Sequence, residues 1–185
     1  VGCGTSPSPE PPVAKNESPK PPSNTNADKA ISEFNKGVEF ADREDWATAI
    51  ACFTDAIRTN PNYAGAYYNR GEAYFYLEEY DKSISDCTEA IRIKPDYAEA
   101  YDTRGLAYRL KGESDKAIAD YTEAIRIKPD LALAYNNRGL VYSELGQSDK
   151  AIADYSEAIR IKPDYIGAYN NRGLAYDELG QLDKA

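Results

Sequence analysis

The 185-residue chain is predicted to fold as an all-α solenoid, a linear stack of helix–turn–helix units. Proline, glycine and tyrosine each recur at intervals of 34 residues along it. They stand at Pro61, Pro95, Pro129 and Pro163, at Gly37, Gly71, Gly105, Gly139 and Gly173, and at Tyr67, Tyr101, Tyr135 and Tyr169. A fixed period of this length is typical of repeat proteins, in which each unit buries its apolar face against its neighbours.

The repeats are predicted to fill residues 30–185, as four complete units and one partial unit. Their boundaries are 30–63, 64–97, 98–131, 132–165 and 166–185. Residues 1–29 differ in composition, because they hold seven of the eleven prolines among Ser, Asn, Thr and Lys. Such a segment has too little apolar surface to offset the entropy lost on folding, so it is predicted to be a disordered linker.

Within each unit the apolar spacing predicts two helices. In the third unit, Tyr101, Gly105 and Tyr108 fall on one face of a first helix. The second helix carries an apolar stripe at Ala117, Ile118, Tyr121, Ala124 and Ile125. A lysine followed by a proline is expected to end each second helix, at Lys94, Lys128 and Lys162.

The ends of the helices are expected to carry capping residues. A left-handed glycine would close first helices at Gly112, Gly146 and Gly180. Asp96 with Glu99 resembles a capping box at the start of a first helix. Second helices are expected to be capped by a serine or by the following aspartate, Ser114 or Asp115 and Ser148 or Asp149.

Glycines in the interior of the first helices require a reason, since each costs about 1 kcal/mol relative to alanine. The expected reason is close packing against a small residue of the second helix. The proposed partners are Ala49, Ala117 and Ala151, with Ser83 in the second unit.

The pattern Y-x2-R-G-x2-Y followed by A-x3-[YF]-x2-A-x4-P resembles the tetratricopeptide repeat over residues 30–185. This resemblance implies a right-handed superhelical α-solenoid whose first helices line a concave groove. Arginine stands where the family commonly has leucine before the glycine, at Arg70, Arg104, Arg138 and Arg172. Cys87 replaces the aromatic residue of the second helix in the second unit.

Composition argues against catalysis and against metal or cofactor binding. The chain has no histidine, which removes the usual general base and a common zinc ligand. Cys52 and Cys87 are not spaced as metal ligands, and no glycine-rich phosphate-binding motif is present. Asp86, Asp120 and Asp154 recur once per unit. They are therefore interpreted as a solvated or ion-paired face, with the recurring arginines as candidate partners.

The net charge of −9 belongs to the repeats, because the charges of the linker cancel. An acidic solenoid disfavours nucleic acid and anionic membrane surfaces as partners and favours proteins with basic residues. A peptide or protein partner is therefore expected.

The resemblance also implies which residues face the groove. The position two before the helix glycine holds Asn35, Asn69, Thr103, Asn137 and Asn171. This row resembles the asparagine ladder in the repeat domain of O-linked N-acetylglucosamine transferases, where such side chains hold an extended peptide backbone. An amide offers both a donor and an acceptor to a peptide group. The alternative is that these are polar residues tolerated on an exposed helix face.

Neighbouring positions would set the preference of the groove for its ligand. A second row of asparagines stands beside the ladder at Asn136 and Asn170. Aromatic surface is supplied by Phe34, Tyr68, Phe75 and Tyr76. Negative charge is supplied by Glu72, Glu99, Asp102, Glu144, Asp177 and Glu178. Phe34 and Tyr76 have the alternative of lying in seams between helices.

One familiar use of the fold is rejected. Some tetratricopeptide cochaperones clamp a C-terminal carboxylate with lysine, asparagine and arginine. The corresponding places hold Phe34 and Val38 in the first unit, Asn69 in the second, and Glu99 and Thr103 in the third. Without the cations, such a clamp would repel its ligand.

The N-terminus provides a separate signal. The residues VGC, followed by a Ser/Pro-rich run, resemble the end of a bacterial lipoprotein signal. This resemblance implies a lipid on Cys3 and anchoring in the bacterial cell envelope, with a cytoplasmic protein as the alternative.

The favoured interpretation is a non-catalytic scaffold that binds a peptide segment of a partner in the groove. One alternative is the targeting module of an enzyme whose catalytic domain lies beyond residue 185. Another is a pilot or assembly lipoprotein for envelope machinery.

Overall fold

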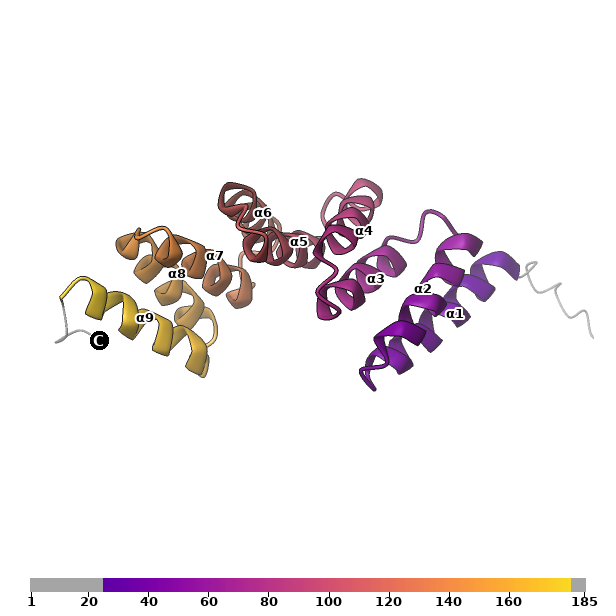
Figure 1. Cartoon of the computed structure of the whole chain (residues 1–185), viewed down its shortest axis with the longest axis horizontal. Helices are drawn as coiled ribbons and strands as arrows, with labels where there is room; N and C mark the ends of the chain where they lie inside the picture. Colours follow the sequence, from indigo (N-terminus) through magenta and orange to yellow (C-terminus); the bar gives the residue numbers. More distant parts are fainter. Residues whose placement is uncertain (1–24, 181–185) are drawn as a thin grey trace, which may run out of the picture.

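The computed structural model describes residues 25–180, and this part of the chain forms nine α-helices and no strand (Figure 1). The helices are α1 (Thr25–Ala41), α2 (Trp46–Thr59), α3 (Ala64–Tyr76), α4 (Tyr80–Ile93), α5 (Ala98–Leu110), α6 (Ser114–Ile127), α7 (Ala132–Glu144), α8 (Ser148–Ile161) and α9 (Ile166–Glu178). The prediction of an all-α helical repeat fold is confirmed.

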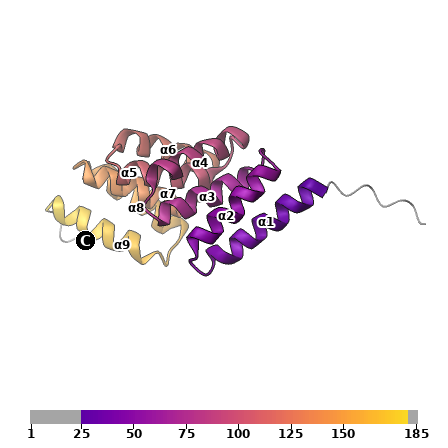
Figure 2. The same ribbon diagram turned by 45° about the vertical axis from the view of Figure 1, so that its right-hand side comes forward.

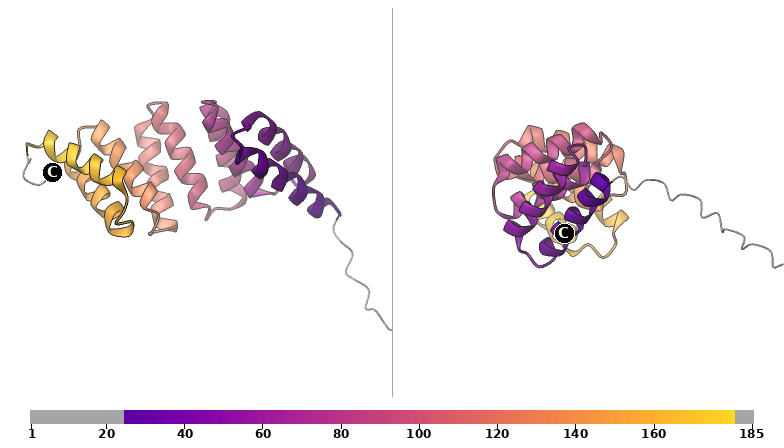
Figure 3. Two further views of the ribbon diagram at one scale, coloured as in Figure 1. Left: turned by 90° about the horizontal axis from the view of Figure 1, so that it is seen from below. Right: turned by 90° about the vertical axis from the view of Figure 1, so that its right-hand side faces the viewer.

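The helices pack in chain order as a row of antiparallel pairs. We call α1, α3, α5, α7 and α9 the first helices, and α2, α4, α6 and α8 the second helices. Each second helix packs on its own first helix and on the first helix of the next unit. Successive first helices also contact one another, whereas within residues 25–180 the second helices do not. Since only the first helices contact one another along the row, they lie on the inner side of the array. Figures 2 and 3 show the row of pairs from other directions.

Small residues allow this close stacking. Alanine is fully buried at the same place of successive first helices, at Ala66, Ala100, Ala134 and Ala168. The second helices bury Ala56, Ala90, Ala124 and Ala158 in the same way. Side chains this small bring the helix backbones close, so van der Waals contacts between neighbouring units replace a single deep core.

The interior glycines of α1, α3, α5 and α7 are closely packed. In α3 a Cβ atom on Gly71 would lie 3.2 Å from the backbone oxygen of the predicted partner Ser83, whereas in α1, α5 and α7 the nearest neighbour is an aromatic ring and not the predicted alanine. A Cβ atom on Gly105 would lie 3.0 Å from the ring of Tyr121, and one on Gly139 would lie 2.7 Å from the ring of Tyr155. The alanines named from the sequence stand one turn earlier on the second helix. The glycine is needed because a flat, fully buried ring lies against the backbone of the first helix.

The left-handed turns after the first helices are present at Gly112, Gly146 and Gly180, with φ values of 75°, 68° and 68°. The two earlier units have the same turn without a glycine. Glu44 and Glu78 take φ values of 58° and 60° there. Glutamate is strained in this region. These two turns could not be predicted from the sequence, because glycine, the usual signal, does not stand there.

Two further expectations differ from the structure. Helix α1 begins at Thr25, so residues 25–29 belong to the first helix and not to the linker. The residues before α5, α6 and α8 make no side-chain capping hydrogen bond, so the predicted caps at Asp96, Ser114 and Ser148 are not formed. Glu99 instead bonds to Lys128, which lies 29 residues away.

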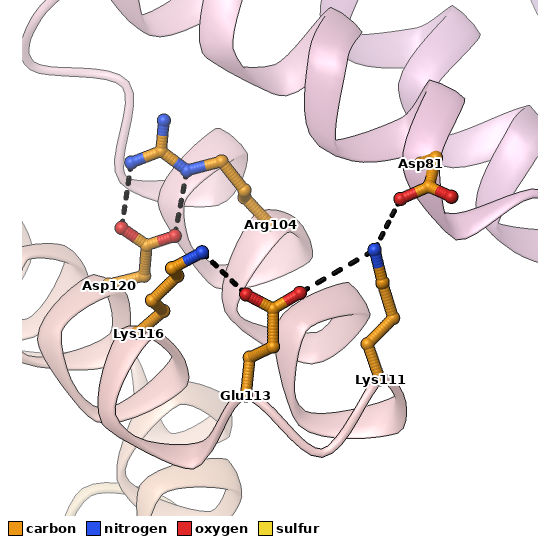
Figure 4. Close-up of polar contacts among 6 residues, drawn as sticks. All are labelled: Asp81, Arg104, Lys111, Glu113, Lys116 and Asp120. Atoms are coloured by element: carbon orange, nitrogen blue, oxygen red, sulfur yellow. Dashed lines mark hydrogen bonds and ion pairs between the residues drawn. The ribbon is translucent and has the colours of Figure 1, made fainter.

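A repeated ion pair joins the two helices in the second, third and fourth units. Arg104 of α5 donates two hydrogen bonds to Asp120 of α6, both at 2.7 Å, and the arrangement is visible in Figure 4. Its third nitrogen donates to the Thr88 hydroxyl of the preceding unit at 3.0 Å. The sets Arg70, Asp86 and Thr54, and Arg138, Asp154 and Thr122, repeat this geometry. Each arginine therefore links two successive second helices, whose backbones are not close neighbours in the described part of the chain.

None of the helices between residues 25 and 180 combines the length and the apolar composition that crossing a membrane requires.

Candidate peptide-binding groove

A cavity of about 170 Å³ opens on the side of the first helices, between α3 and α5. We call it the α3–α5 cavity. Helix α3 contributes Tyr68, Glu72, Phe75 and Tyr76, helix α5 contributes Glu99, Asp102, Thr103 and Leu106, and Leu131 and Leu133 close it from the start of α7. Seven residues named from the sequence as groove positions thus come together here: Tyr68, Glu72, Phe75, Tyr76, Glu99, Asp102 and Thr103.

Aromatic rings form one wall of the α3–α5 cavity. The ring of Tyr68 lies 5.0 Å from that of Tyr97, and Phe75 meets Tyr76 edge-on at 5.9 Å. Tyr76 also stacks on Trp46 of α2 at 4.4 Å, yet more than half of its surface is exposed. It therefore acts both as a seam residue and as part of the wall.

Phe34, by contrast, belongs to a seam between helices. Its ring packs against Phe53 at 5.7 Å and against Tyr63 at 5.0 Å. Thus the aromatic end of the groove begins at α3 and not at α1.

Two carboxylates of the α3–α5 cavity form no ion pair with any lysine or arginine among residues 25–180. Asp102 is only 6% exposed and accepts hydrogen bonds from the Asn137 amide, at 3.3 Å to its nearer oxygen. Burial raises the pKa of Asp102 to about 6, although the bond from Asn137 opposes the change. Glu72 accepts from the Tyr68 hydroxyl at 3.3 Å, and burial raises the pKa of its carboxyl group. The third acid, Glu99, is paired with Lys128 at 3.0 Å.

The tyrosine hydroxyl connects the two sides of the cavity. Tyr68 of α3 donates to Glu72 and lies within hydrogen-bonding reach of Thr103 on α5. Burial raises the pKa of this phenol, which keeps it protonated at neutral pH. Thr103 is thus engaged with the neighbouring helix.

The predicted asparagine ladder serves mainly to join the first helices. Asn137 and Asn136 are each only 6% exposed, and Asn171 donates to the Asn136 carbonyl oxygen at 3.0 Å. Asn69 donates to the backbone oxygen of Gly65 at 2.9 Å. Each of these amides thus makes a hydrogen bond within the domain, between first helices for Asn137 and Asn171 and inside α3 for Asn69, and their contact with a peptide backbone stays a prediction. Asn35 and Asn170 are exposed.

The remaining acids named from the sequence are partly engaged. Glu144 pairs with Arg109 at 2.8 Å, and Glu178 accepts from the Ser148 hydroxyl at 3.0 Å. Asp177 is exposed. The acidic character of the inner side is therefore concentrated at Glu72 and Asp102.

Cys87 is buried and Cys52 half-buried, both as free thiols, and burial raises the pKa of Cys87 to about 12. Between residues 25 and 180, no three acidic or cysteine side chains gather as a metal-binding group. Cys3 and most of the predicted linker lie outside the described residues.

Comparison with known families decides the assignment of the fold. The model for the TPR repeat matches residues 37–77, 105–146 and 141–180, and the tetratricopeptide repeat model matches residues 64–97. The chain belongs to the tetratricopeptide repeat family. No curated protein sequence matches this TPR chain.

Solved structures agree with the assignment. The TPR chain is similar to the MamA protein, with 29% identity over 85% of this chain and 86% of that one, and a TM-score of 0.75. It is similar to the first TPR of Spaghetti (RPAP3) bound to the HSP90 peptide SRMEEVD, with 27% identity over 65% of this chain and 95% of that one, and a TM-score of 0.64. A thermophilic TPR protein of Thermus thermophilus, TTC0263, shares the fold at 24% identity, with coverage of 84% and 85% and a TM-score of 0.69.

Proposed function

We propose that this TPR domain is a non-catalytic protein–protein interaction module that binds a peptide segment of a partner on its inner side. The observation that carries the proposal is the α3–α5 cavity, an aromatic hollow with a few polar groups on the face of the first helices. Concave sites with apolar walls and few polar groups are the usual places of ligand binding. The similarity to a TPR domain that holds a peptide supports the same use here.

The charge of the cavity supports a ligand different from the one in that complex. The bound peptide SRMEEVD ends in acidic residues. Here Glu72 and Asp102 face the cavity, and none of its lining residues is a lysine or an arginine. An acidic peptide end would be repelled, so the partner segment is a basic one.

We also propose that the domain is tethered to the bacterial envelope through a lipid on Cys3. The support is the sequence VGC at the start of a polar, proline-rich segment. Expression with the natural upstream sequence, followed by detergent partitioning and mass spectrometry, tests it. A lipid-modified protein that Cys3→Ser turns soluble is expected, and an unmodified wild-type protein would contradict it.

A peptide-display screen of the full chain tests the binding function. Leu133 and Leu145 are 47% and 43% exposed, so both can be changed without opening a core. Leu133 lines the α3–α5 cavity, whereas Leu145 lies at the turn after α7. Peptides with basic residues are expected to be enriched, and Leu133→Arg is expected to lose their binding while Leu145→Arg keeps it. Absence of any enriched peptide, or equal binding by the two variants, would overturn the proposal.

A further inference from the structure

We propose that the α3–α5 cavity is a receptor for one arginine side chain of the partner segment, with the guanidinium group between Glu72 and Asp102 and beside the rings of Tyr68 and Phe75. This inference rests on the proposed peptide-binding function and adds the residue that the groove selects. It is carried by the unpaired charge of two acids, by the place of those acids in the repeat, and by the shape of the cavity.

Asp102 is an exception among the buried aspartates between residues 25 and 180. Asp86, Asp120 and Asp154 are as deeply buried, and each accepts two hydrogen bonds from an arginine at 2.7–2.8 Å. Asp102 has only the Asn137 amide. A buried carboxylate without a cation is costly, and a cation supplied by a ligand would offset that cost.

The charge of Asp102 is not required by the repeat. The corresponding positions hold Tyr68 in the preceding unit and Asn136 and Asn170 in the two following units. Asn136 accepts a hydrogen bond from Asn171, just as Asp102 accepts one from Asn137. A neutral amide thus makes the same contact between helices, and the negative charge at 102 has no role in the packing.

Glu72 departs from the repeat in the same way. The corresponding positions hold Val38, Leu106, Leu140 and Leu174. Both acids therefore replace neutral residues of the other units, and both line the same cavity. Two such departures at one site are what a site for a cation requires, whereas the stacking of units explains neither.

The size of the cavity selects a side chain and not a whole small molecule. Its volume of about 170 Å³ is below the roughly 300–1,000 Å³ of typical small-molecule pockets. A planar guanidinium can bond two carboxylates at once and stack on aromatic rings, which a lysine ammonium does less well. The same chemistry already occurs in this chain, because Arg104 is bidentate to Asp120 and lies 5.4 Å from the centre of the Tyr101 ring.

A titration with N-acetyl-arginine methylamide, followed by amide NMR shifts of the full chain, tests the inference. Shifts are expected around the α3–α5 cavity, with weak affinity. The citrulline analogue, which has the same shape and no charge, is expected to give none. N-acetyl-lysine methylamide is expected to bind at least several-fold more weakly.

Variants with one charge removed complete the test. Asp102→Asn and Glu72→Gln are each expected to weaken arginine binding by about tenfold, because a hydrogen bond to a charged group is worth about 1.5–3 kcal/mol. Glu89→Gln, an exposed acid of α4 paired only with Arg92, is the matched control and is expected to bind as the wild type does. The spectra of the variants show whether they are folded, and Asn136 indicates that Asp102→Asn fits its site.

Three results would overturn the inference. They are no shift at the cavity with the arginine probe, equal binding of the lysine or citrulline probes, and equal weakening by Glu89→Gln. The display screen separates this inference from the proposed function. If the enriched peptides contain no arginine but still lose binding to Leu133→Arg, the arginine site is wrong and the proposed function stands.

Discussion

The side-chain amide of Asn137, on α7, donates to the buried carboxylate of Asp102, on α5, at 3.3 Å. The contact joins two first helices in the row, and Asn137 is the only side chain among residues 25–180 that donates to Asp102. The same residue thus holds the stack together and presents an unpaired charge to the α3–α5 cavity.

Asp102→Asn should stabilise the domain at neutral pH. The carboxyl group has its pKa raised from 3.8 to about 6 by burial, so the folded state holds its proton more tightly than the unfolded state does. The stability it contributes is complete below pH 4 and is lost as pH rises through 6. The free energy of unfolding of the variant relative to the wild type should therefore increase as the pH rises from 4 to 6. At neutral pH this difference should reach at most about 3 kcal/mol.

Urea unfolding of both proteins across pH 4.5–7.5 measures this difference, since the midpoint follows the free energy of unfolding. A gain that is constant with pH, or a variant less stable than the wild type at pH 7, would contradict the burial of an unpaired charge at this position.

The same change at Asp120 should have the opposite sign. Asp120→Asn or Arg104→Leu leaves one member of a bidentate, mostly buried pair without its partner, at a cost of roughly 3 kcal/mol. Arg104→Leu combined with Asp120→Asn should recover much of that loss, because both charges are then removed. Denaturant midpoints of the single and double variants check this. If the double variant lost as much stability as the two single variants together, the two side chains would not stabilise the domain as a pair.

Glu78→Gly should stabilise the turn between α3 and α4 by about 0.5–1 kcal/mol. The left-handed backbone at Glu78, with φ of 60°, costs a glutamate about 1–2 kcal/mol, and glycine removes this strain. Part of the gain is lost because glycine gives the unfolded chain more conformational freedom. Gly112→Ala is the reverse change at the same place of the next unit, where nothing lies within 4 Å of the added Cβ. Gly112→Ala should lower the melting temperature, and Glu78→Gly should raise it. If thermal melts show that both variants shift the melting temperature in the same direction, backbone strain does not explain the two turns.

Tyr121→Phe should be neutral or stabilising, and Tyr155→Phe should cost about 0.5–1 kcal/mol. The buried Tyr121 hydroxyl has no hydrogen-bond partner among the described residues, whereas Tyr155 lies within hydrogen-bonding reach of Ser143. Phe53 occupies the same position in the first unit, so phenylalanine fits there. The unfolding midpoint of Tyr155→Phe should fall below that of the wild type, and the midpoint of Tyr121→Phe should be equal to it or above it. A loss for Tyr121→Phe equal to that for Tyr155→Phe would be the contrary result.

The sequence predicted the fold because the period of 34 residues repeats every local requirement in register. It also offered the recurring arginines as candidate partners of the recurring aspartates, and the structure pairs Arg70, Arg104 and Arg138 with them. The left-handed turns at Glu44 and Glu78 could not be read in this way, because glycine, the usual signal, is missing there.

The site was predicted less well. A polar residue on a helix face can point to a ligand or to the next helix, and spacing alone does not separate the two. Asn137 and Asn171 turned out to bond to the preceding first helix. The stronger signal was the departure of Glu72 and Asp102 from the other units, which comparison of the repeats with one another can reveal.

The measurement that tests the account most directly is a map of amide NMR shifts for the full chain with a peptide taken from the display screen. The account predicts that the shifts gather on α3, α5 and the start of α7, around Glu72 and Asp102, and that Leu133→Arg removes them. Shifts confined to the second helices α2, α4, α6 and α8, with Leu133→Arg binding as the wild type does, would contradict it.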